Sequence, residues 1–68
     1  MTKVTFFYES HYLFETEMDQ IPQANGLDGG ETFLWIDGER YEVATIDYHF
    51  APTSVGQKLK HVNIELIQ

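Results

Sequence analysis

The fold is decided by residues 33–43, whose sequence is Phe33-Leu34-Trp35-Ile36-Asp37-Gly38-Glu39-Arg40-Tyr41-Glu42-Val43. An Asp-Gly pair between two runs of apolar residues is a strong signal for a β-hairpin, because these two residues tolerate the positive φ angles of a tight turn. The stretch therefore predicts one strand over residues 31–36, a turn over residues 37–39 and a returning strand over residues 40–50. Apolar residues on both faces of the first strand favour a central place in the sheet, covered on both sides.

The returning strand changes its apolar phase partway along. Tyr41 and Val43 fall at odd positions, whereas Ile46 and its apolar successors fall at even positions. Because side chains alternate between the two faces of a strand, this shift predicts a β-bulge near Ala44-Thr45. Such a bulge bends the strand and lets it take part in two sheet faces, as in small barrels.

The N-terminal run, residues 2–8, is rich in β-branched and aromatic residues. This composition predicts a strand with Val4, Phe6 and Tyr8 on one face. The polar residues 9–11 that follow are suited to turning the chain back on itself.

The next segment has two interpretations. As a strand, residues 12–17 pair back onto the N-terminal run and place Tyr12 and Phe14 on one face. As a helix over residues 11–20, the same segment has apolar residues at helical spacing and Ser10 as its N-cap. The strand is the preferred interpretation, because a short helix without a long apolar stripe is marginally stable.

The remaining segments complete a mainly β pattern. Residues 22–30 and 51–57 contain glycine and proline and predict loops, and residues 58–67 alternate between apolar and polar side chains as a strand does. The predicted fold is a single domain over residues 1–68, a small antiparallel five-stranded barrel or half-barrel of SH3-like size. The alternative is an α+β fold, in which a four-stranded antiparallel sheet carries one short helix.

Charge and cysteine content restrict the partners and the compartment. Eleven acidic and four basic residues give a net charge of −7, and ten of the acids lie between Glu9 and Asp47 with Arg40 as the one Lys or Arg among them. Phosphate groups are repelled by such a chain, so we expect neither direct nucleic-acid binding nor membrane binding, but a basic protein partner. The absence of cysteine excludes disulfides and thiolate chemistry, and small domains without disulfides are typical of the cytoplasm.

The order of these motifs resembles a known group of proteins. Ile21-Pro22 precedes a glycine-containing loop, the hairpin follows from Trp35 to Ile46, and the alternating strand Val62-Asn63-Ile64-Glu65-Leu66 closes the pattern. It resembles the small acidic β-barrel-like proteins of bacteriophages that infect Gram-positive hosts. The resemblance covers residues 21–67. It implies a host-takeover or anti-defence protein that binds and disables a host protein in the bacterial cytoplasm, and it implies no catalytic residues.

Acidic residues around the central hairpin are the candidate partner-binding residues. Carboxylates that recur every second residue along a strand are about 6–7 Å apart, which approximates the spacing of backbone phosphates. The candidate residues are Glu15, Glu17, Asp28, Glu31, Asp37, Glu39, Glu42 and Asp47. The hypothesis is an inhibitor that mimics DNA and occupies the basic cleft of a nucleic-acid-binding or defence protein. The alternative for this face is a solvated surface that keeps the protein soluble.

The sequence does not favour catalysis. The three histidines, His11, His49 and His61, lack the spacing of metal ligands, although His49 and His61 can meet across neighbouring strands. Ser10 precedes His11, but adjacent side chains on a strand point to opposite faces. We therefore expect a protein that is not an enzyme and has no metal or other cofactor. The alternative function is a structural or assembly module that forms a homodimer.

Overall fold

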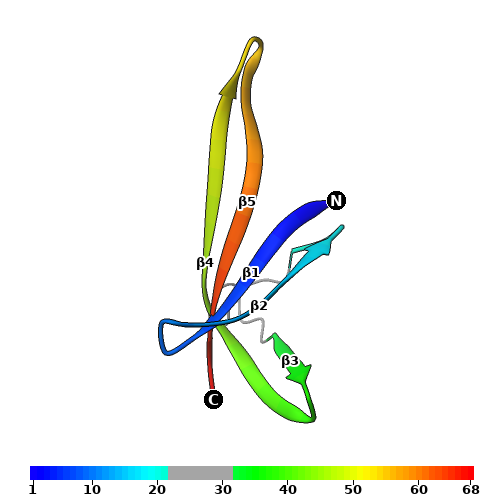
Figure 1. Ribbon diagram of the computed structural model, residues 1–68, viewed down its shortest axis with the longest axis vertical. Helices are drawn as coiled ribbons and strands as arrows, with labels where there is room; N and C mark the ends of the chain where they lie inside the picture. The colour runs from blue at the N-terminus through cyan, green and yellow to red at the C-terminus, as the bar shows by residue number, and fades with distance from the viewer. Residues whose placement is uncertain (22–31) are drawn as a thin grey trace.

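The computed structural model describes residues 1–21 and 32–68, and within them the chain forms one five-stranded sheet and no helix. The sheet curls into a half-barrel (Figure 1). The mainly β prediction is confirmed, and residues 12–17 are a strand and not the alternative helix. The strands are β1 (Thr2–Tyr8), β2 (His11–Met18), β3 (Phe33–Ile36), β4 (Glu39–Thr53) and β5 (Gly56–Ile67).

The first and last strands are neighbours, because the strand order is β2-β1-β5-β4-β3. β1 and β5 run parallel, and the other three pairs are antiparallel. The sheet is therefore mixed, whereas the hairpin pattern predicted antiparallel pairing throughout. Each strand reverses the direction of the strand before it, so the odd-numbered strands all point the same way and β1 meets β5 in parallel.

The predicted bulge is present in β4. Its register against β5 shifts between Val43 and Thr45. Val43 lies opposite Leu66, and Ile46 lies opposite Ile64. The extra residue brings Val43 and Ile46 onto the same inner face of the sheet, which explains the change of apolar phase along the sequence.

A second bulge, in β2, changes the place of an aromatic side chain. Phe14 lies opposite Phe6, but Tyr12 lies opposite Phe7, so Leu13 is an extra residue on β2. Phe14 stacks on Phe6 with ring centroids 4.7 Å apart. Tyr12 meets Phe7 edge-on at 6.3 Å. The prediction that Tyr12 and Phe14 share a face is therefore wrong, because the bulge interrupts the alternation between them.

The hydrophobic core lies on the inner face of β1, β5 and β4. The six buried hydrophobic residues are Val4, Phe6, Val43, Val62, Ile64 and Leu66. Three of them belong to β5, which lies between β1 and β4 and whose alternation predicted this burial. The core is compact and central, so the two ends of the half-barrel carry apolar side chains that are more accessible.

β3 is an edge strand, and the prediction of a central strand covered on both faces is wrong. Within the described residues it pairs on one side, with β4. Trp35 is 70 % exposed. The Arg40 guanidinium lies over the ring of Phe33, 4.6 Å from its centroid. A cation over an aromatic ring is a favourable surface contact, so apolar residues on this face need no second layer.

The loop predicted over residues 51–57 is instead the end of a long hairpin. β4 continues to Thr53 and β5 begins at Gly56, whose φ of 146° closes the turn. The Thr53 hydroxyl donates to the Gly56 carbonyl at 3.2 Å and accepts from the Val55 amide at 3.3 Å. These side-chain bonds hold the turn and let the two strands continue to its edge.

This hairpin projects from the sheet (Figure 1). β1 pairs with β5 from His61 onwards, and His61 lies opposite His49, so residues 50–60 form a two-stranded ribbon, which we call the hairpin arm. Among the described residues no third strand pairs with the hairpin arm. It gives the molecule its long axis, with extents of 42 × 27 × 21 Å.

Candidate functional site

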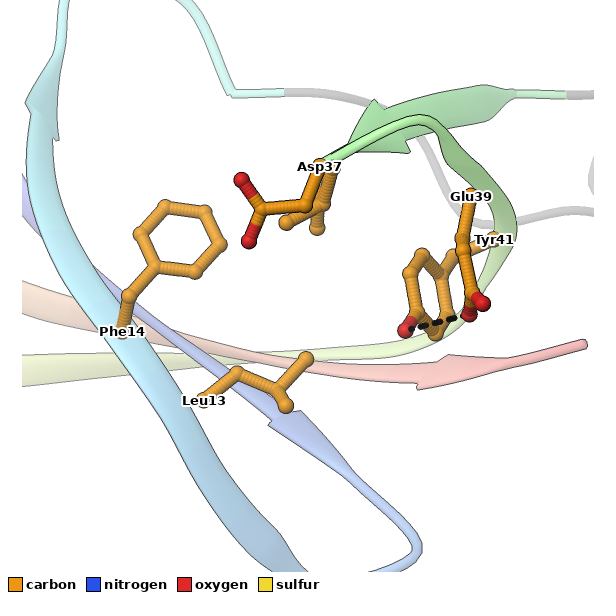
Figure 2. Close-up of a pocket in the computed structure, with 6 residues that line it drawn as sticks. Leu13, Phe14, Asp37, Glu39 and Tyr41 are labelled. Atoms are coloured by element: carbon orange, nitrogen blue, oxygen red, sulfur yellow. Dashed lines mark hydrogen bonds between the residues drawn. The ribbon is translucent and has the colours of Figure 1, made fainter.

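An acid-rimmed groove lies between β2 and the turn that joins β3 to β4 (Figure 2). Its volume is about 500 Å³. Its described lining residues are Leu13, Phe14, Ile36, Asp37, Glu39 and Tyr41. Asp37 and Glu39 are two of the candidate residues from the sequence. The other four were not identified from the sequence as site residues.

The bulge in β2 builds one wall of the groove. On a regular strand Leu13 and Phe14 would point to opposite faces. Leu13 is the extra residue of the bulge, and both side chains pack against the hydrophobic core. Both therefore line the groove. No sequence pattern marks this bulge, because the apolar phase of β2 is too short to show a shift.

The Asp-Gly turn builds the opposite wall. Asp37 and Gly38 have φ angles of 52° and 82°, as the hairpin signal predicted. This backbone holds Asp37 at the rim, and Figure 2 shows its carboxylate directed across the groove toward the Phe14 ring. Glu39 follows at the start of β4. The turn thus places two carboxylates beside an apolar floor.

A hydrogen-bond network orders the Glu39 side of the groove. The Tyr41 hydroxyl donates to Glu39 Oε2 at 3.4 Å, and the Gln68 side-chain amide donates to the same oxygen at 3.0 Å. The Tyr8 hydroxyl in turn donates to Gln68 Oε1 at 3.3 Å. The rings of Tyr8 and Tyr41 meet edge-on at 5.4 Å. Gln68 therefore helps to fix a groove formed by β2 and the β3–β4 turn.

The pKa of Tyr41 is raised above its ordinary value, first by desolvation and then by the negative charge and hydrogen bond of Glu39. Tyr8 and Asp37 add smaller effects in the same direction. The phenol thus stays protonated and acts as a donor to Glu39. A protonated phenol beside a carboxylate is not an activated nucleophile, so this pair is suited to binding and orientation.

The chemistry of the groove favours a cationic and partly apolar ligand. None of its described lining residues is Lys or Arg, and residues 22–31 contain neither. A Lys or Arg side chain can lay its methylene stem along Phe14 and Leu13 while its charged end reaches the two carboxylates. The groove is therefore suited to a basic side chain with apolar neighbours.

The other candidate acids lie elsewhere. Glu15 and Glu17 on β2, and Glu42 and Asp47 on β4, follow the alternation that places them on the outer face of the sheet, away from the core. The row across four strands is Glu15, Thr5, Asn63 and Asp47. At about 4.8 Å per strand its two acids are about 14 Å apart. Asp28 and Glu31 lie outside the described residues.

Lys3 interrupts the outer acids. Its ammonium lies 3.7 Å from Glu15 Oε2, and the Thr5 hydroxyl donates to Glu15 Oε1 at 3.3 Å. Glu65 is an outer-face acid that is not among the candidate residues, although its alternation with buried Ile64 and Leu66 predicts this position. Its carboxylate accepts from the Ser10 amide at 2.8 Å.

Two histidines also share the outer face. The rings of His49 and His61 stack with centroids 4.4 Å apart, so these residues do meet across neighbouring strands. In residues 1–21 and 32–68 there is no group of three or more His, Cys, Asp or Glu side chains that could hold a metal ion.

The same part of the chain contains no helix that could cross a membrane. No protein-family model, curated protein or solved structure matches this chain.

Proposed function

We propose that the protein is a non-catalytic inhibitor that binds a basic segment of a partner protein in the acid-rimmed groove. The observation that carries this proposal is the pair of carboxylates, Asp37 and Glu39, at the rim of an apolar groove whose described lining has no cation. The net charge of −7 supports the same class of partner, because it attracts basic proteins from a distance.

The biological setting follows from the resemblance to bacteriophage proteins. The partner is a basic host protein in the bacterial cytoplasm, of the nucleic-acid-binding or defence type, and it is disabled when its basic segment is occupied. DNA mimicry in this proposal is local, because Thr5, Asn63 and Lys3 separate the acids of the outer face. Those acids steer the partner, and the groove anchors it.

A peptide titration tests the groove. The probe is an eight-residue peptide of alternating Lys and Leu, and an alternating Glu and Leu peptide is its charge-reversed control. Amide NMR shifts in a ¹⁵N-labelled sample report the place of binding. We expect the Lys peptide to shift the amides of Leu13, Phe14 and Asp37, because it supplies both the charge and the apolar contact that the groove accepts.

Paired variants separate the groove from general charge attraction. Asp37→Asn plus Glu39→Gln removes the rim charges and should weaken Lys-peptide binding about tenfold or more. Glu17→Gln plus Asp47→Asn removes the same charge from the outer face and should change it by no more than about twofold, through screened attraction alone. Equal losses in the two double variants would show that net charge, and not the groove, accounts for binding.

A further inference from the structure

The hairpin arm carries apolar side chains without cover. Phe50 is 58 % exposed and Val55 is 94 % exposed, and Tyr48, which lies on β4 just before the arm, is 51 % exposed. Tyr48 and Phe50 are two residues apart on β4, so they share one face of the ribbon, and Leu59 lies opposite Phe50. A two-stranded hairpin is marginally stable by itself in water, so a surface that packs against Tyr48 and Phe50 would stabilise the hairpin arm.

The hairpin arm also has the opposite charge from the rest of the molecule. Its residues, 50–60, contain Lys58 and Lys60 and no acid. The other described residues contain nine acids against Lys3 and Arg40. One chain thus presents a basic apolar projection and an acidic apolar groove, which are complementary in charge and in polarity.

We propose that two copies of the protein form a symmetric dimer in which the hairpin arm of each copy lies in the acid-rimmed groove of the other. This inference rests on the proposed function, because it names a second copy of the chain as an occupant of the same groove. Lys58, which is on the face of the ribbon opposite Phe50, and Lys60, the extra residue of a bulge at the base of the hairpin arm, reach Asp37 and Glu39 at the rim of the other copy's groove. Phe50 meets the apolar floor.

The shape of the molecule suits this arrangement. The turn of the hairpin arm and the β3–β4 turn lie toward opposite ends of the long axis (Figure 1). Two copies placed side by side and antiparallel therefore bring each hairpin arm to the other copy's groove, and the two identical contacts close the assembly as a dimer. A second cleft of about 330 Å³ shares Phe14 and Ile36 with the groove and extends it toward Met18 and Leu34, which gives room for a second aromatic ring.

Direct pairing of two hairpin arms is disfavoured. The edge of β5 that β1 leaves unpaired carries Lys58 and Lys60. Lysines on an exposed edge strand oppose pairing with an identical edge, because like charges then meet. The same lysines are attracted to the rim carboxylates, so charge selects the groove over a second hairpin arm.

The dimer regulates the groove. A basic partner must displace the hairpin arm before it binds, so dilution of the protein exposes the groove and concentration masks it. Apparent affinity for the alternating Lys and Leu peptide should therefore fall as the protein concentration rises through the dimerisation range. This dependence would be absent if the groove were open in every state.

A charge-exchange experiment tests the contact by analytical ultracentrifugation. The first variant, Lys58→Glu plus Lys60→Glu, makes the hairpin arm acidic. The second, Asp37→Asn plus Glu39→Lys, makes the rim basic while it keeps at position 37 a residue that tolerates positive φ. Each variant alone should be monomeric, because arm and groove then carry the same sign. An equimolar mixture should form a dimer, because every hairpin arm meets a groove of opposite sign.

The control is Glu17→Lys plus Asp47→Asn, which changes the net charge as the second variant does but on the outer face. It should leave the wild-type dimer intact. Circular dichroism confirms that each variant is folded. A wild type that stays monomeric up to about 1 mM, a mixture that stays monomeric, or a dimer that survives in both charge variants would each overturn the proposed contact.

The peptide titration distinguishes the dimer from the proposed function. Groove binding of the Lys peptide by a monomeric wild type would leave the proposed function standing. A dimer whose groove does not bind the peptide at any concentration would remove the proposed function.

Discussion

Tyr41 connects the hydrophobic core to the groove within a single residue. Its ring packs against the core and against Tyr8, while its hydroxyl donates to Glu39 at the rim. The desolvation that raises its pKa and the carboxylate that it supports are therefore parts of one arrangement. A hydroxyl at this position holds Glu39 in place without neutralising it, which preserves the negative rim.

This arrangement predicts a loss of stability in alkali. Because the folded-state pKa of Tyr41 lies above its unfolded value near 10.0, its contribution to the free energy of unfolding is complete below that value and is lost as pH rises through the folded pKa. Urea unfolding between about pH 9 and pH 11 should show this loss in the wild type, and Tyr41→Phe should reduce it. Tyr12→Phe, at an exposed position, is the control, and an alkaline loss that is the same in both variants would contradict the assignment.

At the scale of elements, the sequence predicts features that follow from the repeated alternation of side chains along a strand. It does not predict a single irregularity in a short strand. The β4 bulge was found because a phase shift in a long strand is visible on both sides of it. The bulge at Leu13 was missed, because β2 has too few apolar positions before it to show a phase. The sequence predicts a central position for β3, because apolar residues on both faces cannot distinguish a second layer from a cation such as Arg40 lying over Phe33.

The sequence also does not predict the hairpin arm, because residues that usually interrupt strands occur within it. Pro52 and Gly56 predicted a loop, but Pro52 lies in an exposed part of β4 where its missing amide leaves no buried partner unsatisfied. Gly56 supplies the turn and does not end the strand pairing. For the groove, sequence identified the charged rim at Asp37 and Glu39. It did not identify the floor, which depends on how far the sheet curls.

Replacement of the hairpin arm tests whether it is an independent element. Residues 51–58 are exchanged for Asn-Gly, which joins Phe50 to Leu59 by a two-residue turn. The six core residues lie outside the exchanged segment, so the free energy of unfolding should change by no more than about 1 kcal/mol, measured by urea unfolding below the dimerisation range. Dimerisation should be lost in the same protein. A variant that unfolds, or that dimerises as the wild type does, would show that the arm does not have the separate role we assign to it.

At the scale of the whole molecule, the charges are segregated along the long axis. The basic hairpin arm and the acidic groove are held apart within one copy by the length of the sheet (Figure 1). A chain with this arrangement satisfies its complementary surfaces between molecules. Electrostatics then sets the orientation of the contact, and the apolar side chains of the arm supply affinity that salt does not screen.

These two contributions predict different responses to salt. Between ionic strengths of about 0.1 M and 1 M the Debye length falls from about 10 Å to about 3 Å, so the wild-type dimer should weaken about tenfold or more. Lys58→Gln plus Lys60→Gln should weaken the dimer at low salt and flatten this dependence, because it removes the charges that salt screens. Phe50→Ala should weaken the dimer about tenfold at every salt concentration and keep the wild-type slope, because its contact is apolar. Sedimentation equilibrium measures all three, and a Phe50→Ala slope that flattens as the lysine variant does would show that charge and apolar contact do not separate in the way the groove requires.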